Sequence, residues 1–185
     1  MDHSHTHFSP NRYAARNSPR TIPTMTVMSA ADLQAFLARE FPEVGALDLR
    51  VEHVDEQRIR LRLPAHESTL RPGGTISGPT MFTLADVAIY LLVLAQIGPV
   101  ALAVTTSVGM NFLRKPPPGD LVAEGELLKL GSRLAVGHVR IHAEGSAKGS
   151  AKGGADDSAA DSADGDHDSE ELVADASLTY SIPPR

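Results

Sequence analysis

Asp86 is the residue of this chain that most needs a chemical explanation. The segment FTLADVAIYLLVLAQIG, residues 82–98, has the length of a helix and is apolar almost throughout, yet it contains this one carboxylate. An ionised carboxylate is expensive to bury unless it is paired or hydrogen-bonded. Asp86 is therefore either satisfied inside the core by hydroxyls such as that of Thr83, or placed in a cleft as a base or nucleophile.

A second feature with chemical potential directly precedes this segment. Ser77 suits the N-cap of a helix and Pro79 is tolerated in its first turn, so the backbone N–H of Gly78 is free to point at an anion or a polarised carbonyl. Eight residues of helix separate Gly78 from Asp86, roughly 12 Å at 1.5 Å per residue. Gly78 and Asp86 of one chain therefore cannot both act on the same carbon atom.

Composition limits the kinds of site that can surround these residues. A chain of 185 residues is long enough for one domain with a proper core. It has no Cys, which excludes disulfides, thiolate metal sites and cysteine nucleophiles. The longest uninterrupted apolar run lies between Asp86 and Gln96 and is shorter than the ~20 residues of a membrane span. We expect a soluble protein with no membrane partner.

Two segments have the composition of disordered chain. Residues 145–170 consist mainly of Gly, Ala, Ser and Asp and include most of the acidic excess behind the net charge of −6. We interpret them as an insertion within a single domain over residues 30–182, preceded by a tail at 1–29 and followed by a short tail at 183–185. The tail histidines His3, His5 and His7 make at most a weak metal site, so neither a metal nor another cofactor is expected. No secretory signal is present, which favours a cytoplasmic protein, and no nucleic-acid partner is expected.

The remaining pattern predicts an α+β fold. An amphipathic helix begins after Ser29 and stops at Pro42, and an alternating hairpin over residues 46–64 turns near Asp55 and Glu56. After the long apolar helix come four more alternating segments, at 100–113, 120–130, 134–143 and 171–182. An antiparallel sheet of about six strands wrapped around the long helix would explain why that helix is apolar on every side.

Two stretches of the chain resemble one known family. RPGGTISGPTMFTLADVA, residues 71–88, and TTSVGMNFLRKPPPGDLVAEGELLKLGSRLAVGHVRI, residues 105–141, are similar to the hotdog-fold acyl-CoA thioesterases of the phenylacetate-degradation (PaaI-type) group. The resemblance covers residues 30–182 apart from the acidic insertion. It implies a hotdog fold and an acyl-CoA substrate.

The resemblance also implies roles for individual residues. The family's helix carboxylate, a nucleophile or general base, falls on Asp86, and its oxyanion-binding backbone N–H falls on Gly78. Ser107 aligns with a hydroxyl that orients water in some relatives. The family forms two-fold dimers, in which Gly78 of one subunit would face Asp86 of its partner. We therefore expect a homodimer, or a tetramer made of two dimers.

Two positions depart from the family's pattern. Many relatives carry His-Gly-Gly at the helix start and an Asn upstream, where this chain has Ser77-Gly78-Pro79 and Arg71. Arg71 could pair with Asp86 in the cleft, bind a substrate carboxylate, or lie in solvent. Ser77 and the strand residue Thr105 are further candidates for substrate contacts.

Cations in predicted turns are candidates for binding the phosphates of coenzyme A. They are Arg114, Lys115 and Arg133, although turn cations are also common on ordinary solvated surfaces.

The leading prediction is hydrolysis of acyl-CoA thioesters that carry a medium aliphatic or aryl acyl group. The alternative is a non-catalytic acyl-binding protein that kept the groove and lost turnover. The departures at Arg71 and Ser77 are consistent with this alternative. A hotdog dehydratase is disfavoured, because that group carries a His five residues after the helix Asp and this chain has Leu91 there.

Overall fold

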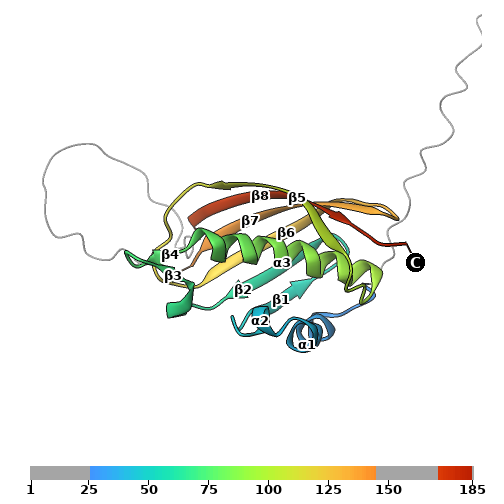
Figure 1. The fold of residues 1–185 in the computed structure, drawn as a ribbon, viewed down its shortest axis with the longest axis horizontal. Coiled ribbons are helices and arrows are strands. Elements are labelled where there is room, and N and C mark those ends of the chain that lie inside the picture. Colours follow the sequence, from blue (N-terminus) through green and yellow to red (C-terminus); the bar gives the residue numbers. More distant parts are fainter. Residues whose placement is uncertain (1–25, 145–170, 185) are drawn as a thin grey trace, which may run out of the picture.

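The computed structural model describes residues 26–144 and 171–184. Its main element is a six-stranded antiparallel sheet with the spatial order β1-β2-β6-β7-β8-β5. Figure 1 shows this sheet curving over one long helix, α3. The strands are β1 (Arg50–Val54), β2 (Arg58–Leu63), β5 (Val104–Phe112), β6 (Leu121–Leu130), β7 (Leu134–Ala143) and β8 (Glu171–Ser181). The expected hotdog fold is thereby confirmed.

The central helix α3 spans Gly78–Ile97 and begins as expected. Ser77 is its N-cap, with a side chain that accepts a hydrogen bond from the Thr80 N–H at 3.2 Å. The helix ends at Gly98, whose φ of 86° suits glycine. The length of α3 and its mean hydropathy of 1.8 would also fit a membrane span, which we did not expect. However, 61% of that stretch is buried inside the protein, so α3 is the core helix.

Two glycines allow the sheet to approach α3 closely. A Cβ atom at Gly137 on β7 would lie 2.6 Å from Cδ1 of Ile89 on α3, and one at Gly125 on β6 would lie 3.4 Å from the same atom. The contact at Gly137 is closer than real carbon atoms come, so a larger residue there would push the layers apart.

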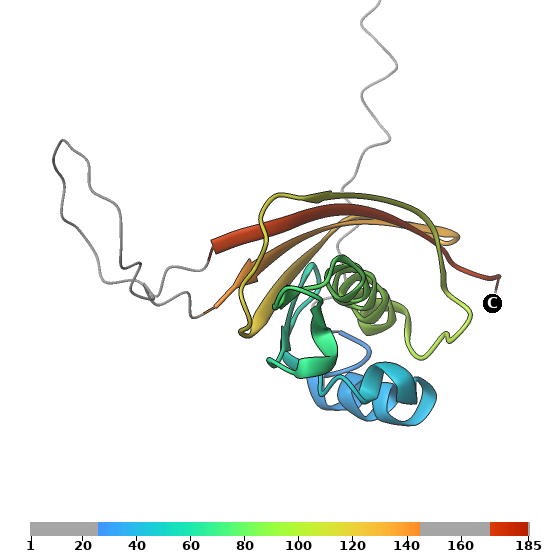
Figure 2. The same ribbon diagram turned by 60° about the vertical axis from the view of Figure 1, so that its left-hand side comes forward.

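The shorter elements surround this core. The first helix, α1 (Ala30–Glu40), has the expected N-cap, because Ser29 and Asp32 form a reciprocal capping box. Pro42 stops α1 and starts a second short helix, α2 (Pro42–Gly45), which we did not predict. Both helices lie near the β1 edge of the sheet (Figure 2). The glycine-rich loop before α3 forms a small hairpin of β3 (Leu70–Arg71) and β4 (Thr75–Ile76), preceded by a 3-10 turn at Glu67–Thr69.

Strands β7 and β8 are antiparallel neighbours in the sheet. Ala143, the last residue of β7, pairs with Glu171, the first residue of β8. The expected acidic insertion and most of the expected N-terminal tail lie outside the described residues.

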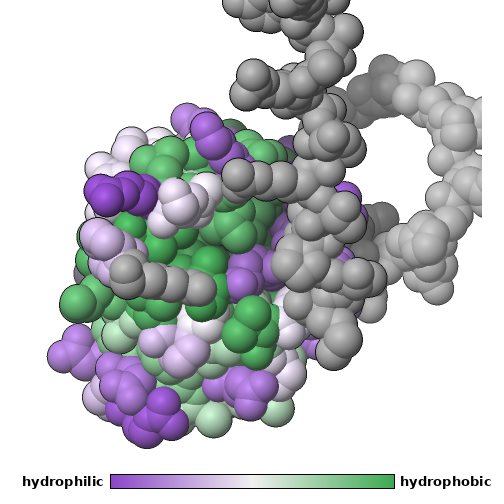
Figure 3. All heavy atoms as spheres, turned by 90° about the vertical axis from the view of Figure 1, so that its right-hand side faces the viewer, coloured by the Kyte–Doolittle hydropathy of each residue, from purple (hydrophilic) through white to green (hydrophobic). Residues whose placement is uncertain are grey.

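Strand β5 forms one edge of the sheet and has a neighbouring strand, β8, on one side only. Its register shifts between Thr105 and Ser107, where Thr106 is an extra residue. Several exposed apolar side chains lie at or beside this strand: Leu102, Val104, Phe112 and Leu113 are 51–74% exposed. Figure 3, a view from the end where α3 finishes, shows apolar surface across much of that face. Exposed apolar surface of this extent is typical of an interface.

Candidate active site

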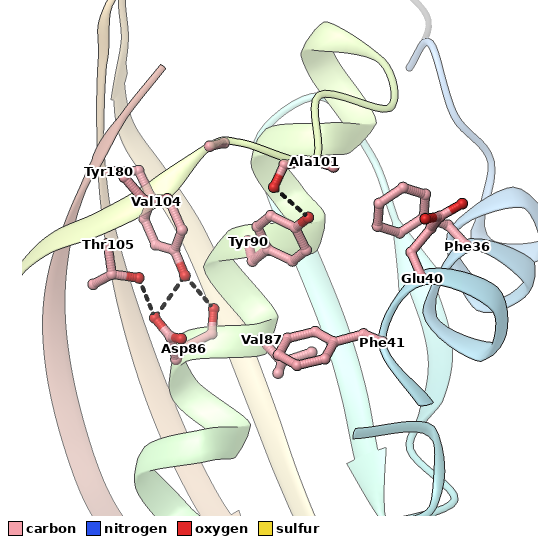
Figure 4. A pocket seen from close by; sticks show the side chains of 11 residues that line it. Phe36, Glu40, Phe41, Asp86, Val87, Tyr90, Ala101, Val104, Thr105 and Tyr180 are labelled. Atoms are coloured by element: carbon pink, nitrogen blue, oxygen red, sulfur yellow. Dashed lines mark hydrogen bonds between the residues drawn. The ribbon is translucent and has the colours of Figure 1, made fainter. Parts of the chain in front are cut away.

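Asp86 lies at the polar end of a pocket of about 370 Å³, which we call the Asp86 pocket. The pocket opens between α3, the start of β5 and the end of α1. In Figure 4, Thr105 and Tyr180 approach Asp86 from the sheet, while Phe36, Glu40 and Phe41 lie on the opposite side. The remaining lining residues are Val87, Tyr90, Ala101, Ala103 and Val104.

The Asp86 carboxylate is half-buried and receives two hydrogen bonds from hydroxyls. Thr105 Oγ1 donates to Asp86 Oδ1 at 2.6 Å, and Tyr180 OH lies 2.6 Å from the same oxygen. The Tyr180 hydroxyl also lies 2.8 Å from the backbone carbonyl oxygen of Asp86. Thr83, which we had considered as a partner, instead donates to the carbonyl of Pro79. Asp86 is therefore both partnered and in contact with a pocket.

The body of the Asp86 pocket is aromatic. The Tyr90 ring lies between those of Phe36 and Tyr180, with centroid distances of 6.2 and 6.3 Å. Burial, and secondarily the nearby Glu40 carboxylate, raises the pKa of Tyr90. Glu40 is half-exposed and bonds to Arg39. The pocket thus combines a half-buried carboxylate with an aromatic body and has a second carboxylate at its far side.

Gly78 lines a different pocket of about 390 Å³, which we call the Gly78 pocket. Three of the predicted cations, Arg71, Arg114 and Lys115, line it together, and its floor includes Met81 and Phe112. The Gly78 N–H has no hydrogen-bond partner within the described part of the chain, as expected for the first residue of a helix. This pocket combines a free backbone donor with positive charge, which suits an anionic ligand.

The individual cations differ in their surroundings. Arg71 is exposed on the β3–β4 hairpin and donates to Thr75 Oγ1 at 2.7 Å, so it does not pair with Asp86 of its own chain. Arg114 forms an exposed ion pair with Glu171 at 2.9 Å. Arg133 lies in the β6–β7 turn, at the end of the sheet away from β3 and β4 (Figure 1). The structure therefore does not group Arg133 with the other three.

Ser107 does not join the Asp86 cluster. Its Cα pairs with that of Thr179, whereas Leu178 and Tyr180 hold the core-facing positions of β8. Because side chains alternate between the faces of a strand, Ser107 occupies an outward-facing position. Thr105 is the β5 hydroxyl that contacts Asp86. Ser77 acts as the helix cap and lies beside Gly78.

The sequence patterns do not identify the pocket-lining residues that come from β8 and α1. They assign Tyr180 only to the last strand and α1 only as an amphipathic helix. The usable signal for Tyr180 was a hydroxyl at a core-facing position in the series Ala176, Leu178, Tyr180. Among the described residues, no cluster of His, Asp or Glu has the arrangement of a metal site.

Comparisons with known proteins support a thioesterase fold. Residues 73–150 match the model of the thioesterase superfamily. A protein of Halobacterium salinarum named as an esterase is 31% identical over 125 residues, which cover 63% of this chain and 82% of that protein. The crystal structure of a protein assigned as a thioesterase from Silicibacter sp. TM1040 has a TM-score of 0.69 and 40% identity, covering 87% of this chain and 96% of that one.

A more distant structure shares the fold. It is a hypothetical thioesterase of Streptococcus pneumoniae TIGR4, solved with coenzyme A, with a TM-score of 0.60 and 18% identity over 83% of this chain and 98% of that one.

Proposed function

Because this chain belongs to the thioesterase superfamily, we propose that it hydrolyses acyl-CoA thioesters to a free acid and coenzyme A, as its PaaI-type motifs suggest. The observation that carries this proposal is the Asp86 carboxylate at the polar end of a pocket with an aromatic body. The aromatic lining suits a medium aliphatic or aryl acyl group. The presence of coenzyme A in a structure of the same fold makes this thiol the first to test.

The proposed site is shared between two chains. Val104 and Thr105, at the start of β5, line the Asp86 pocket, whereas Phe112, at its end, lines the Gly78 pocket. If two β5 edges pair antiparallel about a two-fold axis, the start of one strand lies beside the end of the other. Each Asp86 pocket then adjoins the Gly78 pocket of the partner. The exposed apolar side chains at and beside β5 support this pairing.

In this arrangement the acyl group occupies the Asp86 pocket and the thioester carbonyl faces the partner subunit's Gly78. Asp86 takes a proton from an attacking water, or itself attacks the carbonyl carbon to form a mixed anhydride that water then hydrolyses to the free acid. The Gly78 N–H stabilises the oxyanion, the carbon–sulfur bond breaks, and the thiolate leaves and takes up a proton. Arg71, Arg114 and Lys115 lie where they can bind the phosphates of coenzyme A.

The test is release of free thiol from a panel of acyl-CoA substrates, including octanoyl-CoA and phenylacetyl-CoA, by the wild type and by Asp86→Asn. The substitution keeps the size of the side chain but removes its basicity, so kcat should fall by roughly 10²-fold or more. Asp48→Asn is a matched control. Asp48 is exposed, lines neither pocket and has a φ of 53°, which Asn tolerates well.

Two results would count against the proposal. Undiminished turnover in folded Asp86→Asn would contradict the assigned mechanism. If the wild type binds acyl-CoA but releases no thiol from any substrate, the chain is a non-catalytic acyl-binding protein.

A further inference from the structure

Tyr180 makes a contact with Asp86 that its packing alone does not require. Its side chain is 1% exposed, and it comes from β8, the strand before the C-terminus. Its hydroxyl lies 2.6 Å from Asp86 Oδ1 and 2.8 Å from the backbone carbonyl oxygen of the same residue. One phenol therefore holds both the side chain and the main chain of the candidate catalytic residue (Figure 4).

The two oxygens of the Asp86 carboxylate are not equivalent. Oδ1 accepts from Thr105 on β5 and from Tyr180 on β8. Oδ2 has no hydrogen-bond partner within the described residues. Two donors on one oxygen fix the orientation of the carboxylate plane and leave the other oxygen available to water or substrate.

We propose that Tyr180 is a positioning residue, which orients the Asp86 carboxylate so that Oδ2 is the reactive oxygen. This inference rests on the proposed function, because it concerns the same carboxylate. Tyr180 does not touch the thioester and acts only through Asp86.

The charges around the pocket make this contribution important. The titratable groups that face Asp86 are Tyr180 from β8, Tyr90 from its own helix and Glu40 from α1. No Lys, Arg or His from the described chain lines the pocket. Within one chain, the Asp86 carboxylate is therefore held by neutral hydroxyls rather than by a cation.

Tyr180 is well suited to remain a donor. Burial, together with the adjacent Asp86 carboxylate, raises the pKa of the Tyr180 phenol well above its usual value of 10.0. The phenol keeps its proton throughout the pH range in which a thioesterase would work, so it can donate to Asp86 but cannot act as a base.

The test is Tyr180→Phe, which keeps the ring but removes the donor. In wild-type and variant proteins labelled with ¹³C at Asp carboxyls, the Asp86 signal is assigned by its loss in Asp86→Asn. At one fixed pH, the chemical shift of this signal should change in Tyr180→Phe, because the carboxylate loses a hydrogen-bond donor. The value of kcat should fall by roughly tenfold while KM changes little.

Tyr90→Phe is the matched comparison. It removes an equivalent hydroxyl from the neighbouring ring, where the nearest acceptor is the Ala101 carbonyl at 3.4 Å rather than Asp86. The Asp86 signal should keep its chemical shift. An unchanged Asp86 signal in folded Tyr180→Phe, or equal changes in both variants, would overturn the inference.

The readout by NMR separates this inference from the proposed function. If the wild type releases no thiol, the proposed function fails, yet the Asp86 carboxyl signal still tests the role of Tyr180. If Tyr180→Phe does not fold, site-specific 3,5-difluorotyrosine at position 180 keeps the shape and strengthens the donor. The Asp86 signal should then shift in response to the stronger donor, and its failure to move would refute the role of Tyr180.

Discussion

Gly78 and Asp86 lie on the same helix but line two different pockets. Gly78 begins α3 beside Phe112, at the end of β5, whereas Asp86 faces Thr105, near the start of that strand. The expectation that one chain cannot use both groups on one carbonyl agrees with this separation. A two-chain site has a consequence that can be tested by mixing variants.

Two inactive variants should restore activity when their subunits are exchanged. Gly78→Pro removes the free N–H at the first helical position, where proline is well tolerated, and should lower kcat on the order of 10²-fold. When it is unfolded and refolded with an equal amount of Asp86→Asn, half of the dimers are mixed and each contains one intact site. Thiol release should then reach about a quarter of the wild-type value.

The control for this experiment is Gly78→Ala, which keeps the N–H. Its Cβ would lie 3.5 Å from the Phe112 ring, an ordinary contact, so activity should stay within a few-fold of wild type. If mixing restores nothing, or if sedimentation finds an active monomer, the shared site is wrong.

Glu40 should disfavour acyl groups that end in a carboxylate. It lies at the side of the pocket opposite Asp86, and its side chain is 45% exposed, so the repulsion is partly screened. Glu40→Gln should lower KM for glutaryl-CoA by about threefold to fivefold, with little change for phenylacetyl-CoA. The measurement is the ratio of kcat/KM for the two substrates.

The matched control is Glu43→Gln, because Glu43 is exposed on α2 and lines neither pocket. An unchanged ratio in Glu40→Gln would show that this carboxylate does not sense the acyl group.

The segment between β7 and β8 should be dispensable for folding. Ala143 and Glu171 are already paired, so a short turn can join the two strands. Loop length has a weak effect on stability, ~0.6 kcal/mol per doubling. Replacing residues 145–169 by a short Gly-containing turn should leave the urea midpoint nearly unchanged and thiol release within a few-fold. A large fall in the urea midpoint or in thiol release would show that the segment contributes to stability or activity. A changed salt dependence of KM would indicate that it screens coenzyme A.

The fold was more predictable than the site. Regular alternation around Ile59, Leu61 and Leu63 and a long apolar segment after an N-cap predict the sheet and its helix, because these patterns depend on nearest neighbours in sequence. The pocket depends on contacts between distant elements. Tyr180 lies 94 residues from Asp86, and no local pattern couples the two. The sequence pattern shows the apolar face of α1, but it does not show that Glu40 lines the Asp86 pocket.

The extra residue in β5 also affects how relatives of this chain should be compared. Counted back from Val108 with regular alternation, the residue opposite Tyr180 would be Thr106, but the bulge gives that position to Thr105. In a relative with an uninterrupted strand, the equivalent hydroxyl would therefore stand one place later in an ungapped alignment. Residues on the N-terminal half of this strand should therefore be matched to those of a relative by their pairing partners on β8. A conservation profile computed column by column would mix two structurally different positions.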